Sequence, residues 1–122
     1  SGQSTELASK AYDLGGIKLV KSRIAGMDGK ALRELVDNLK TQLPDSVVVL
    51  ASAQDGRLSM VAGVQGKALQ KLKAGDVLGH IAAQIGGKGG GRADFAQGGG
   101  DDGPAFDGAL SNLDAWLAER LQ

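Results

Sequence analysis

The apolar positions of the first third of the chain change from a strand pattern to a helical one. GIKLVKSRIAG at 16–26 has apolar residues in short clusters among polar ones, which predicts a strand. Asp28 can cap the helix that follows. Along that helix the apolar residues recur at helical spacing: Leu32, Leu35, Val36, Leu39 and Leu43.

The next segment has the pattern of a buried strand followed by a hairpin. SVVVLASA at 46–53 is continuously apolar and rich in valine, which predicts a central strand buried on both faces. The pair Asp55–Gly56 favours a tight turn, and LSMVAGV at 58–64 then alternates as the antiparallel partner strand. The chain is therefore expected to begin its sheet as β-α-β-β.

The second half is predicted to be mostly helical around a glycine-rich loop. Residues 66–76 form a basic helical stretch, Asp76 can cap a further helix, and DFAQ at 94–97 suits a short edge strand. Pro104 fits the first turn of a final helix. That helix has an apolar stripe through which it should dock on the sheet: Phe106, Leu110, Leu113, Leu117 and Leu121. The predicted fold class is α+β, with a mixed sheet of four to five strands, helices packed on it and a docked C-terminal helix.

Composition narrows the possible chemistry. The chain has 122 residues, the size of one domain, and no cysteine, so disulfides, thiolate metal sites and cysteine nucleophiles are excluded. His80 is the only histidine, which makes a zinc site or histidine catalysis a poor fit. No apolar run has the roughly 18–20 residues that a membrane span needs. We expect a cytoplasmic protein without membrane contact.

Charge is unevenly distributed although the formal net charge is zero. Residues 57–92 carry six basic groups against one acidic group, a balance of +5. Residues 93–122 carry one basic group against six acidic ones, a balance of −5. Either the two segments fold side by side and cancel, or residues 57–92 form a basic face that attracts a polyanion, because screening confines such fields to about 8 Å.

The stretch GGKGGGRADFAQGGG at 86–100 is the candidate binding element. A linker should separate two domains, but only one helix follows, and a lone helix does not fold by itself. The spacing also fails the phosphate-binding motifs GxxxxGK[ST] and GxGxxG. Glycine backbones can nevertheless approach phosphate closely, and nearby cations and an amide can assist. The candidate RNA-binding residues are Lys88, Gly89, Gly90, Gly91, Arg92 and Gln97, with Lys67, Lys71 and Lys73 from the preceding basic stretch.

The same stretch resembles the glycine-rich signature of the DHH-associated domain family. Within that family, residues 8–122 are similar to the C-terminal domains of bacterial alanyl-tRNA synthetases. The similarity includes SKAYDLGGIKLVKSRIAGMDGKALRELVDNLK, VVVLASAQDGRLSMVAGV and the terminal LDAWLAERLQ. One departure is Ala93, where relatives usually have proline after the arginine.

The resemblance implies a non-catalytic tRNA-binding domain of an alanine–tRNA ligase. Such a domain grips the elbow of tRNA(Ala) and links the aminoacylation and editing domains of the same chain. It implies no cofactor in this chain; ATP, Mg and Zn would belong to the parent enzyme. Residues 1–14 would be the tail of a helical segment that can mediate homodimerisation, and residues 15–122 the globular domain.

Two alternatives stay open at this point. The same signature occurs in accessory domains of DHH-family phosphoesterases, where the loop would hold a nucleotide beside a metal-dependent catalytic domain. The other alternative is a dimerisation module. Motifs upstream of this chain would separate a synthetase from a phosphoesterase. Light scattering with and without tRNA would test the dimerisation module.

Overall fold

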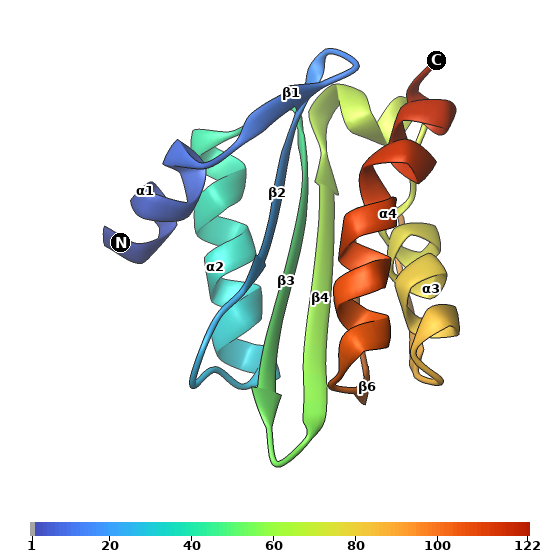
Figure 1. The fold of residues 1–122 in the computed structure, drawn as a ribbon. Helices are drawn as coiled ribbons and strands as arrows, with labels where there is room; N and C mark the ends of the chain where they lie inside the picture. The colour runs from blue at the N-terminus through green and yellow to red at the C-terminus, as the bar shows by residue number, and fades with distance from the viewer. Residues whose placement is uncertain (1) are drawn as a thin grey trace.

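The computed structural model describes residues 2–122, which form one mixed six-stranded sheet with helices on both faces (Figure 1). The helices are α1 Gly2–Ser9, α2 Gly29–Gln42, α3 Ala74–Gln84 and α4 Pro104–Leu121, and a 3-10 helix, η1, spans Gly66–Gln70. The strands are β1 Tyr12–Leu14, β2 Ile17–Arg23, β3 Ser46–Gln54, β4 Arg57–Gln65, β5 Lys88–Gly91 and β6 Phe95–Asp101. None of these helices is long and apolar enough to cross a membrane.

The strand order is β1-β2-β3-β4-β6-β5. Strands β2 and β3 are parallel, because α2 connects them, and the other neighbouring pairs are antiparallel. This confirms the α+β class, the β-α-β-β start and the central position of the 46–53 strand. The sheet has six strands, at least one more than expected, because β1 and β5 were not predicted as strands.

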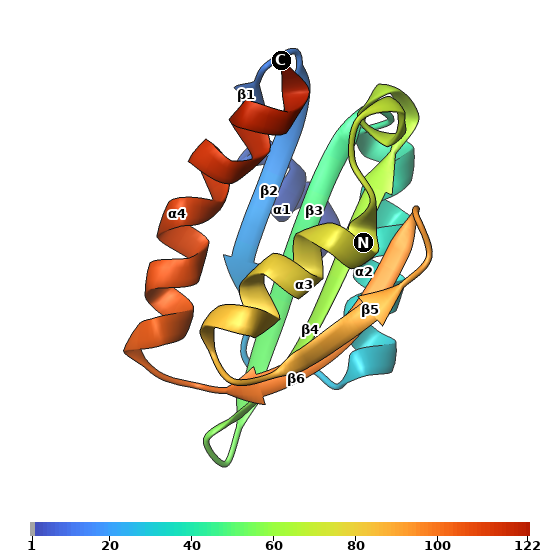
Figure 2. The ribbon, with the colours of Figure 1, turned by 90° about the vertical axis from the view of Figure 1, so that its right-hand side faces the viewer.

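Helices α1 and α2 lie on one face of the sheet, and α3 and α4 lie on the other (Figures 1 and 2). Alternate residues of β3 therefore enter two different cores. Val47, Val49 and Ala51 belong to the core under α3 and α4. Val48 and Leu50 belong to the core under α2. A continuous apolar strand results, as the pattern at 46–53 predicted.

Local signals in the sequence set several element boundaries correctly. Asp28 caps α2, where its Oδ1 accepts a hydrogen bond from the Ala31 N–H at 2.9 Å. Asp55 and Gly56 both have positive φ, 53° and 77°, as a tight hairpin turn between β3 and β4 requires. Pro104 begins α4, as predicted.

The final helix docks as its apolar stripe predicted. Phe106, Leu113 and Leu117 are fully buried against the sheet, and Leu110 packs partly buried beside them. The helix lies next to α3, on the side of β2 (Figure 2).

Three local predictions were wrong. Asp76 lies inside the first turn of α3, and Lys73 occupies the cap position without a side-chain hydrogen bond. The glycine-rich stretch is a β-hairpin and not a loop, since β5 and β6 pair over four positions. Its DFAQ part is no edge strand, because β6 lies between β4 and β5 and extends to Asp101.

Candidate nucleic-acid interface

One face of the β5–β6 hairpin consists of glycine because α3 lies directly on it. The side chain of Ile85 occupies the space where Gly100 would carry a Cβ, and Leu78 lies 3.1 Å from the corresponding point at Gly89. At Gly98, an added Cβ would meet the backbone of Lys88 and Gly89 on β5. The glycine content of this hairpin thus allows close packing of helix on sheet as well as of strand on strand.

The opposite face of the hairpin carries the polar side chains. Lys88 pairs with Gly99, and Gly90 pairs with Gln97, so the Lys88 and Gln97 side chains emerge on the same face. Both residues are exposed. This is the α2 side of the sheet, since Gln97 is level with Val61, which is buried in the α2 core. Because β5 is an edge strand, alternate backbone groups on its outer side also point away from the sheet.

A pocket of about 190 Å³ opens beside these residues. It is lined by the backbone of Gly90 and Gly91 and by side chains from β6, α2 and the hairpin turn: Arg33, Arg92, Phe95, Ala96 and Gln97. The guanidinium of Arg33 lies 4.3 Å from the centroid of the Phe95 ring, a cation–π contact that orients it. Arg33 was not among the predicted site residues, because its place on α2 gives no sequence signal that it meets β6.

Two of the predicted cations, Arg92 and Lys73, lie at or near the hairpin turn. Arg92 forms an ion pair with Asp94, with Nε and Oδ1 3.2 Å apart. The start of α3 lies against this turn, because the Ala74 N–H donates to the Ala93 carbonyl at 2.7 Å. Lys73 directly precedes Ala74, so the structure places its backbone near Arg92.

The remaining predicted cations are more dispersed. Lys88 lies at the other end of β5 from Arg92. The two are four positions apart, which is about 13 Å along a strand that rises about 3.3 Å per residue. Lys71 donates from Nζ to the backbone carbonyls of Leu121 and Gln122, at 3.2 and 2.9 Å. The backbone N–H of Lys67 donates to Asp45 on the loop before β3. The nine candidate residues therefore form a hairpin group with Lys73 and a separate pair, Lys67 and Lys71.

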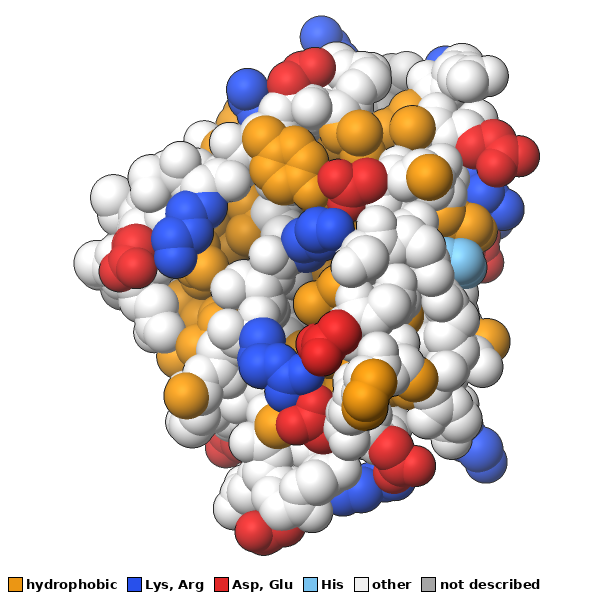
Figure 3. All heavy atoms as spheres, in the orientation of Figure 1, with side chains coloured by type: hydrophobic (Ala, Val, Ile, Leu, Met, Phe, Trp, Pro, Cys, Tyr) orange, Lys and Arg blue, Asp and Glu red, His pale blue; other side chains and the backbone are white. Residues whose placement is uncertain are grey.

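The acidic segment after residue 93 is largely neutralised by β2. Lys21 pairs with Asp114 at 2.9 Å, and Arg23 pairs with both Asp102 and Asp107, at 2.6 and 3.3 Å. Figure 3 shows the result on the side of β2 and α4, where basic and acidic side chains are interspersed.

The basic segment 57–92 contributes less to this pairing. Arg57 and Arg92 meet acidic partners, Asp101 and Asp94, in exposed pairs. Within residues 2–122, its four lysines form no ion pair: Lys67, Lys71, Lys73 and Lys88. Their charge stays available to an anion.

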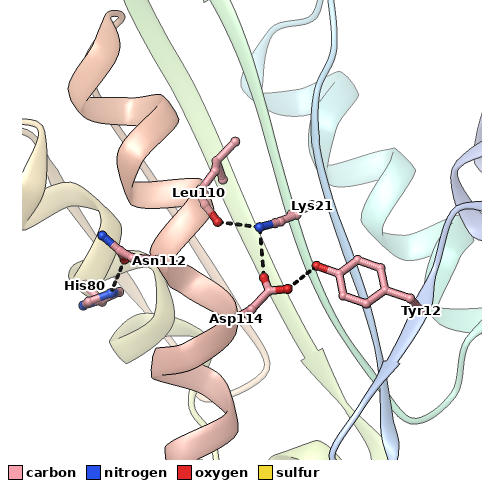
Figure 4. A network of polar contacts seen from close by, with 6 residues as sticks. All are labelled: Tyr12, Lys21, His80, Leu110, Asn112 and Asp114. Atoms are coloured by element: carbon pink, nitrogen blue, oxygen red, sulfur yellow. Dashed lines mark hydrogen bonds and ion pairs between the residues drawn. The ribbon is translucent and has the colours of Figure 1, made fainter.

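A polar network ties α4 to the other edge of the sheet. Asp114 accepts a hydrogen bond from the Tyr12 hydroxyl at 2.6 Å and pairs with Lys21, which also donates to the Leu110 carbonyl (Figure 4). Partial burial, followed by the hydrogen bond and charge of Asp114, raises the pKa of Tyr12 to about 12. This network is structural, because it joins β1, β2 and α4 away from the hairpin.

A metal site needs several ligating side chains close together. No group of three or more His, Asp or Glu side chains among residues 2–122 has the geometry to hold a metal ion. His80 is partly buried, stacks on Trp116 with ring centroids 4.5 Å apart, and contacts Asn112. The candidate site is the face of the hairpin around Arg33, Arg92 and Gln97.

The chain is similar in sequence to a known domain family over most of its length. The DHHA1 domain model matches residues 16–119, which is most of the chain. The chain belongs to the DHHA1 domain family. It is 53% identical over 121 residues to the alanine–tRNA ligase of Stenotrophomonas maltophilia, covering 99% of this chain. It spans only 14% of the length of that relative.

Two solved structures are similar to this chain in fold. The C-Ala domain of Aquifex aeolicus alanyl-tRNA synthetase superimposes with a TM-score of 0.81 at 31% identity, over 89% of this chain and 98% of that one. The chain is thus homologous to the C-terminal domain of alanyl-tRNA synthetases and not to their catalytic part. A protein described as a member of the S1P family of ribosomal proteins, DHH domain, has a TM-score of 0.65 at 14% identity, over 98% of this chain and 30% of that one. That second likeness shows the fold alone.

Proposed function

We propose that this DHHA1 domain binds tRNA through the α2-side face of the β5–β6 hairpin. The observation that carries the proposal is the cluster of Arg33, Arg92 and Gln97 around a pocket whose wall is glycine backbone. Its homology to the C-terminal domain of alanyl-tRNA synthetases supports tRNA as the polyanion.

The chemistry of this face suits an RNA backbone. Arginine forms forked hydrogen bonds to phosphate, and the planar Arg33 is already held on Phe95. Glycines at positions 90 and 91 keep side chains out of the way, so a phosphate or ribose can approach the strand edge. The ion pair of Arg92 with Asp94 is exposed and therefore weak, so it competes little with a phosphate. Gln97 can bind a ribose hydroxyl or a base edge.

At the level of the whole protein, we propose a parent alanine–tRNA ligase that charges tRNA(Ala) with alanine. The parent would use ATP, Mg and Zn in domains outside this chain and would act in the cytoplasm. This domain would hold the tRNA elbow and link aminoacylation to editing. Within residues 1–14, helix α1 would continue a helical segment that allows homodimerisation, whereas β1 pairs with β2 in the sheet of the globular unit.

The tRNA proposal is tested by binding measurements on the 122-residue chain over a series of salt concentrations. Each lost phosphate contact lowers the slope of log K against log salt by about 0.7–0.9. The double variant Lys88→Ala/Arg92→Ala should therefore bind more weakly, with a slope smaller by about 1.5.

The matched control is Lys18→Ala/Lys40→Ala, which removes the same charge from two exposed lysines on β2 and α2. It should bind nearly as wild type. If both double variants behave alike, the hairpin is not the contact surface. If wild type shows no salt slope, the domain does not bind RNA through phosphates.

A further inference from the structure

A row of three planar side chains lies along the seam between α3 and α4. The His80 ring stacks on Trp116 with centroids 4.5 Å apart and 13° between the planes. The guanidinium of Arg120 lies 3.8 Å from the centroid of the Trp116 ring. Hydrogen bonds fix both neighbours, since His80 Nε2 is 3.1 Å from Asn112 Oδ1 (Figure 4) and Arg120 donates to the Trp116 carbonyl. The stack is therefore preorganised before any ligand arrives.

A cavity of about 430 Å³ opens beside this row, between the two helices. Its lining is Asp76, Gly79, His80, Trp116 and Arg120. The volume is within the range of small-molecule sites, about 300–1,000 Å³. Neither Asp76 nor Arg120 forms an ion pair within residues 2–122. The cavity thus offers the Asp76 carboxylate as an acceptor, and the Arg120 guanidinium keeps donors besides the one that it uses on the Trp116 carbonyl.

Gly79 keeps the cavity open at a cost to the helix. Glycine weakens a helix interior relative to alanine, and a Cβ at Gly79 would meet no atom within 4 Å. Packing does explain the other glycine of α3, because a Cβ at Gly75 would lie 3.2 Å from the Gly91 carbonyl oxygen. No such contact accounts for Gly79, whose missing side chain instead leaves room in the cavity.

We propose that this cavity binds a single unstacked guanine base. Unpaired bases are bound by stacking on aromatic or guanidinium planes and by hydrogen bonds to their Watson–Crick edges. The guanine edge presents two adjacent donors, N1–H and the N2 amino group, which match the two oxygens of the Asp76 carboxylate. Adenine presents one donor beside an acceptor, which a carboxylate repels. Arg120 can meet the guanine O6 or the attached phosphate.

This site is separate from the hairpin surface. Its lining residues come from α3 and α4, whereas Arg33 of α2 lines the hairpin pocket. The ribbon places α2 and the pair α3 and α4 on opposite faces of the sheet (Figure 1). The proposal therefore does not rest on tRNA binding through β5 and β6, and each can fail without the other.

Trp116 is the only tryptophan of the chain, so its fluorescence reports directly on the stack. Titration with GMP should quench it saturably, with AMP at least tenfold weaker and ribose 5-phosphate without effect. Equal affinity for GMP and AMP, or no saturable quenching by GMP, would overturn the proposal.

Two glycines provide a matched pair of variants. Gly79→Leu fills the cavity and should abolish GMP quenching, whereas Gly108→Leu should keep it, since Gly108 lies in α4 outside the cavity with equally open space. Asp76→Asn should reduce the preference for GMP over AMP to below about threefold, because one acceptor oxygen becomes a donor. Circular dichroism checks that each variant is folded. If folded Gly79→Leu binds GMP as wild type, the cavity is not the site.

The base can come from a free nucleotide or from RNA. An oligouridine containing one guanine should compete with GMP for the same Trp116 signal. Tighter binding of this RNA than of GMP assigns the site to RNA, and equal binding assigns it to the free nucleotide. Quenching by oligouridine without guanine at the same affinity would contradict a guanine site.

Discussion

The phenol of Tyr12 ionises in an environment that the fold creates. Its hydroxyl donates to Asp114, and partial burial together with this partner raises the pKa from 10.0 to about 12. The folded state therefore favours the neutral phenol. This contribution to stability is fully present below pH 10 and is lost as the pH rises from 10 to 12.

Tyr12 is the only tyrosine, so an absorbance titration of the phenolate follows it alone. We expect one transition near pH 12 in the folded chain. Asp114→Asn should move it towards 10 without reaching it, because burial remains. A wild-type transition at pH 10 would show that the Tyr12–Asp114 contact does not form in solution.

Gly98 illustrates why single residues of the hairpin must be glycine. A Cβ there would meet the Lys88 carbonyl oxygen and the Gly89 Cα, both backbone atoms that cannot move aside. Gly98→Ala should therefore lower the free energy of unfolding by about 2 kcal/mol. Urea denaturation measures this, with Gly108→Ala as the control, which should be neutral or stabilising by up to about 1 kcal/mol. Equal stability of the two variants would contradict the close approach of β5 and β6.

At the scale of elements, most predictions from local signals succeeded, although the Asp76 cap was wrong. The cap of α2 by Asp28, the Asp55–Gly56 turn and the apolar stripe of α4 all depend on neighbours within a few residues. The hairpin at 88–101 was not predicted, because glycine is depleted in strands. The pairing of its two strands is decided by the packing of α3 against them. Strand β1 was not predicted either, because its three residues are too few to show the alternation of a strand.

The candidate site was predicted only in its hairpin half. Lys88, Arg92 and Gln97 could be named from composition, but Arg33 comes from α2 and meets Phe95 only in the folded chain. Periodicity marks which face of a helix is polar; it gives no information about which distant strand that face adjoins.

Helix α2 should therefore contribute to RNA binding. Arg33→Ala removes one guanidinium from the pocket and should weaken tRNA binding, with a salt slope smaller by about 0.7–0.9. Lys40→Ala is the control, an exposed cation near the other end of the same helix. If Arg33→Ala and Lys40→Ala have the same small effect, α2 does not take part in the site.

For the molecule as a whole, the sequence shows the uneven distribution of charge but not which charged residues form ion pairs. The acidic residues of 93–122 find partners mainly on β2, in Lys21 and Arg23, which the sequence places far away. Both possibilities raised by the charge distribution are thus partly realised: Arg57 and Arg92 pair with that segment, and the four lysines of 57–92 do not. This leaves a net-neutral chain in which the lysines of 57–92 that form no ion pair lie in η1, in the turn before α3 and at the start of β5.

The central claim is that RNA contacts the α2-side face of the β5–β6 hairpin. Backbone amide chemical shifts of the ¹⁵N-labelled chain, followed as tRNA is added, test it most directly. The account predicts the largest changes at Gly89–Arg92, Gln97 and Arg33, with residues of α1 and β1 unaffected. Changes confined to η1 or to the α3–α4 seam, with the hairpin amides unmoved, would contradict it.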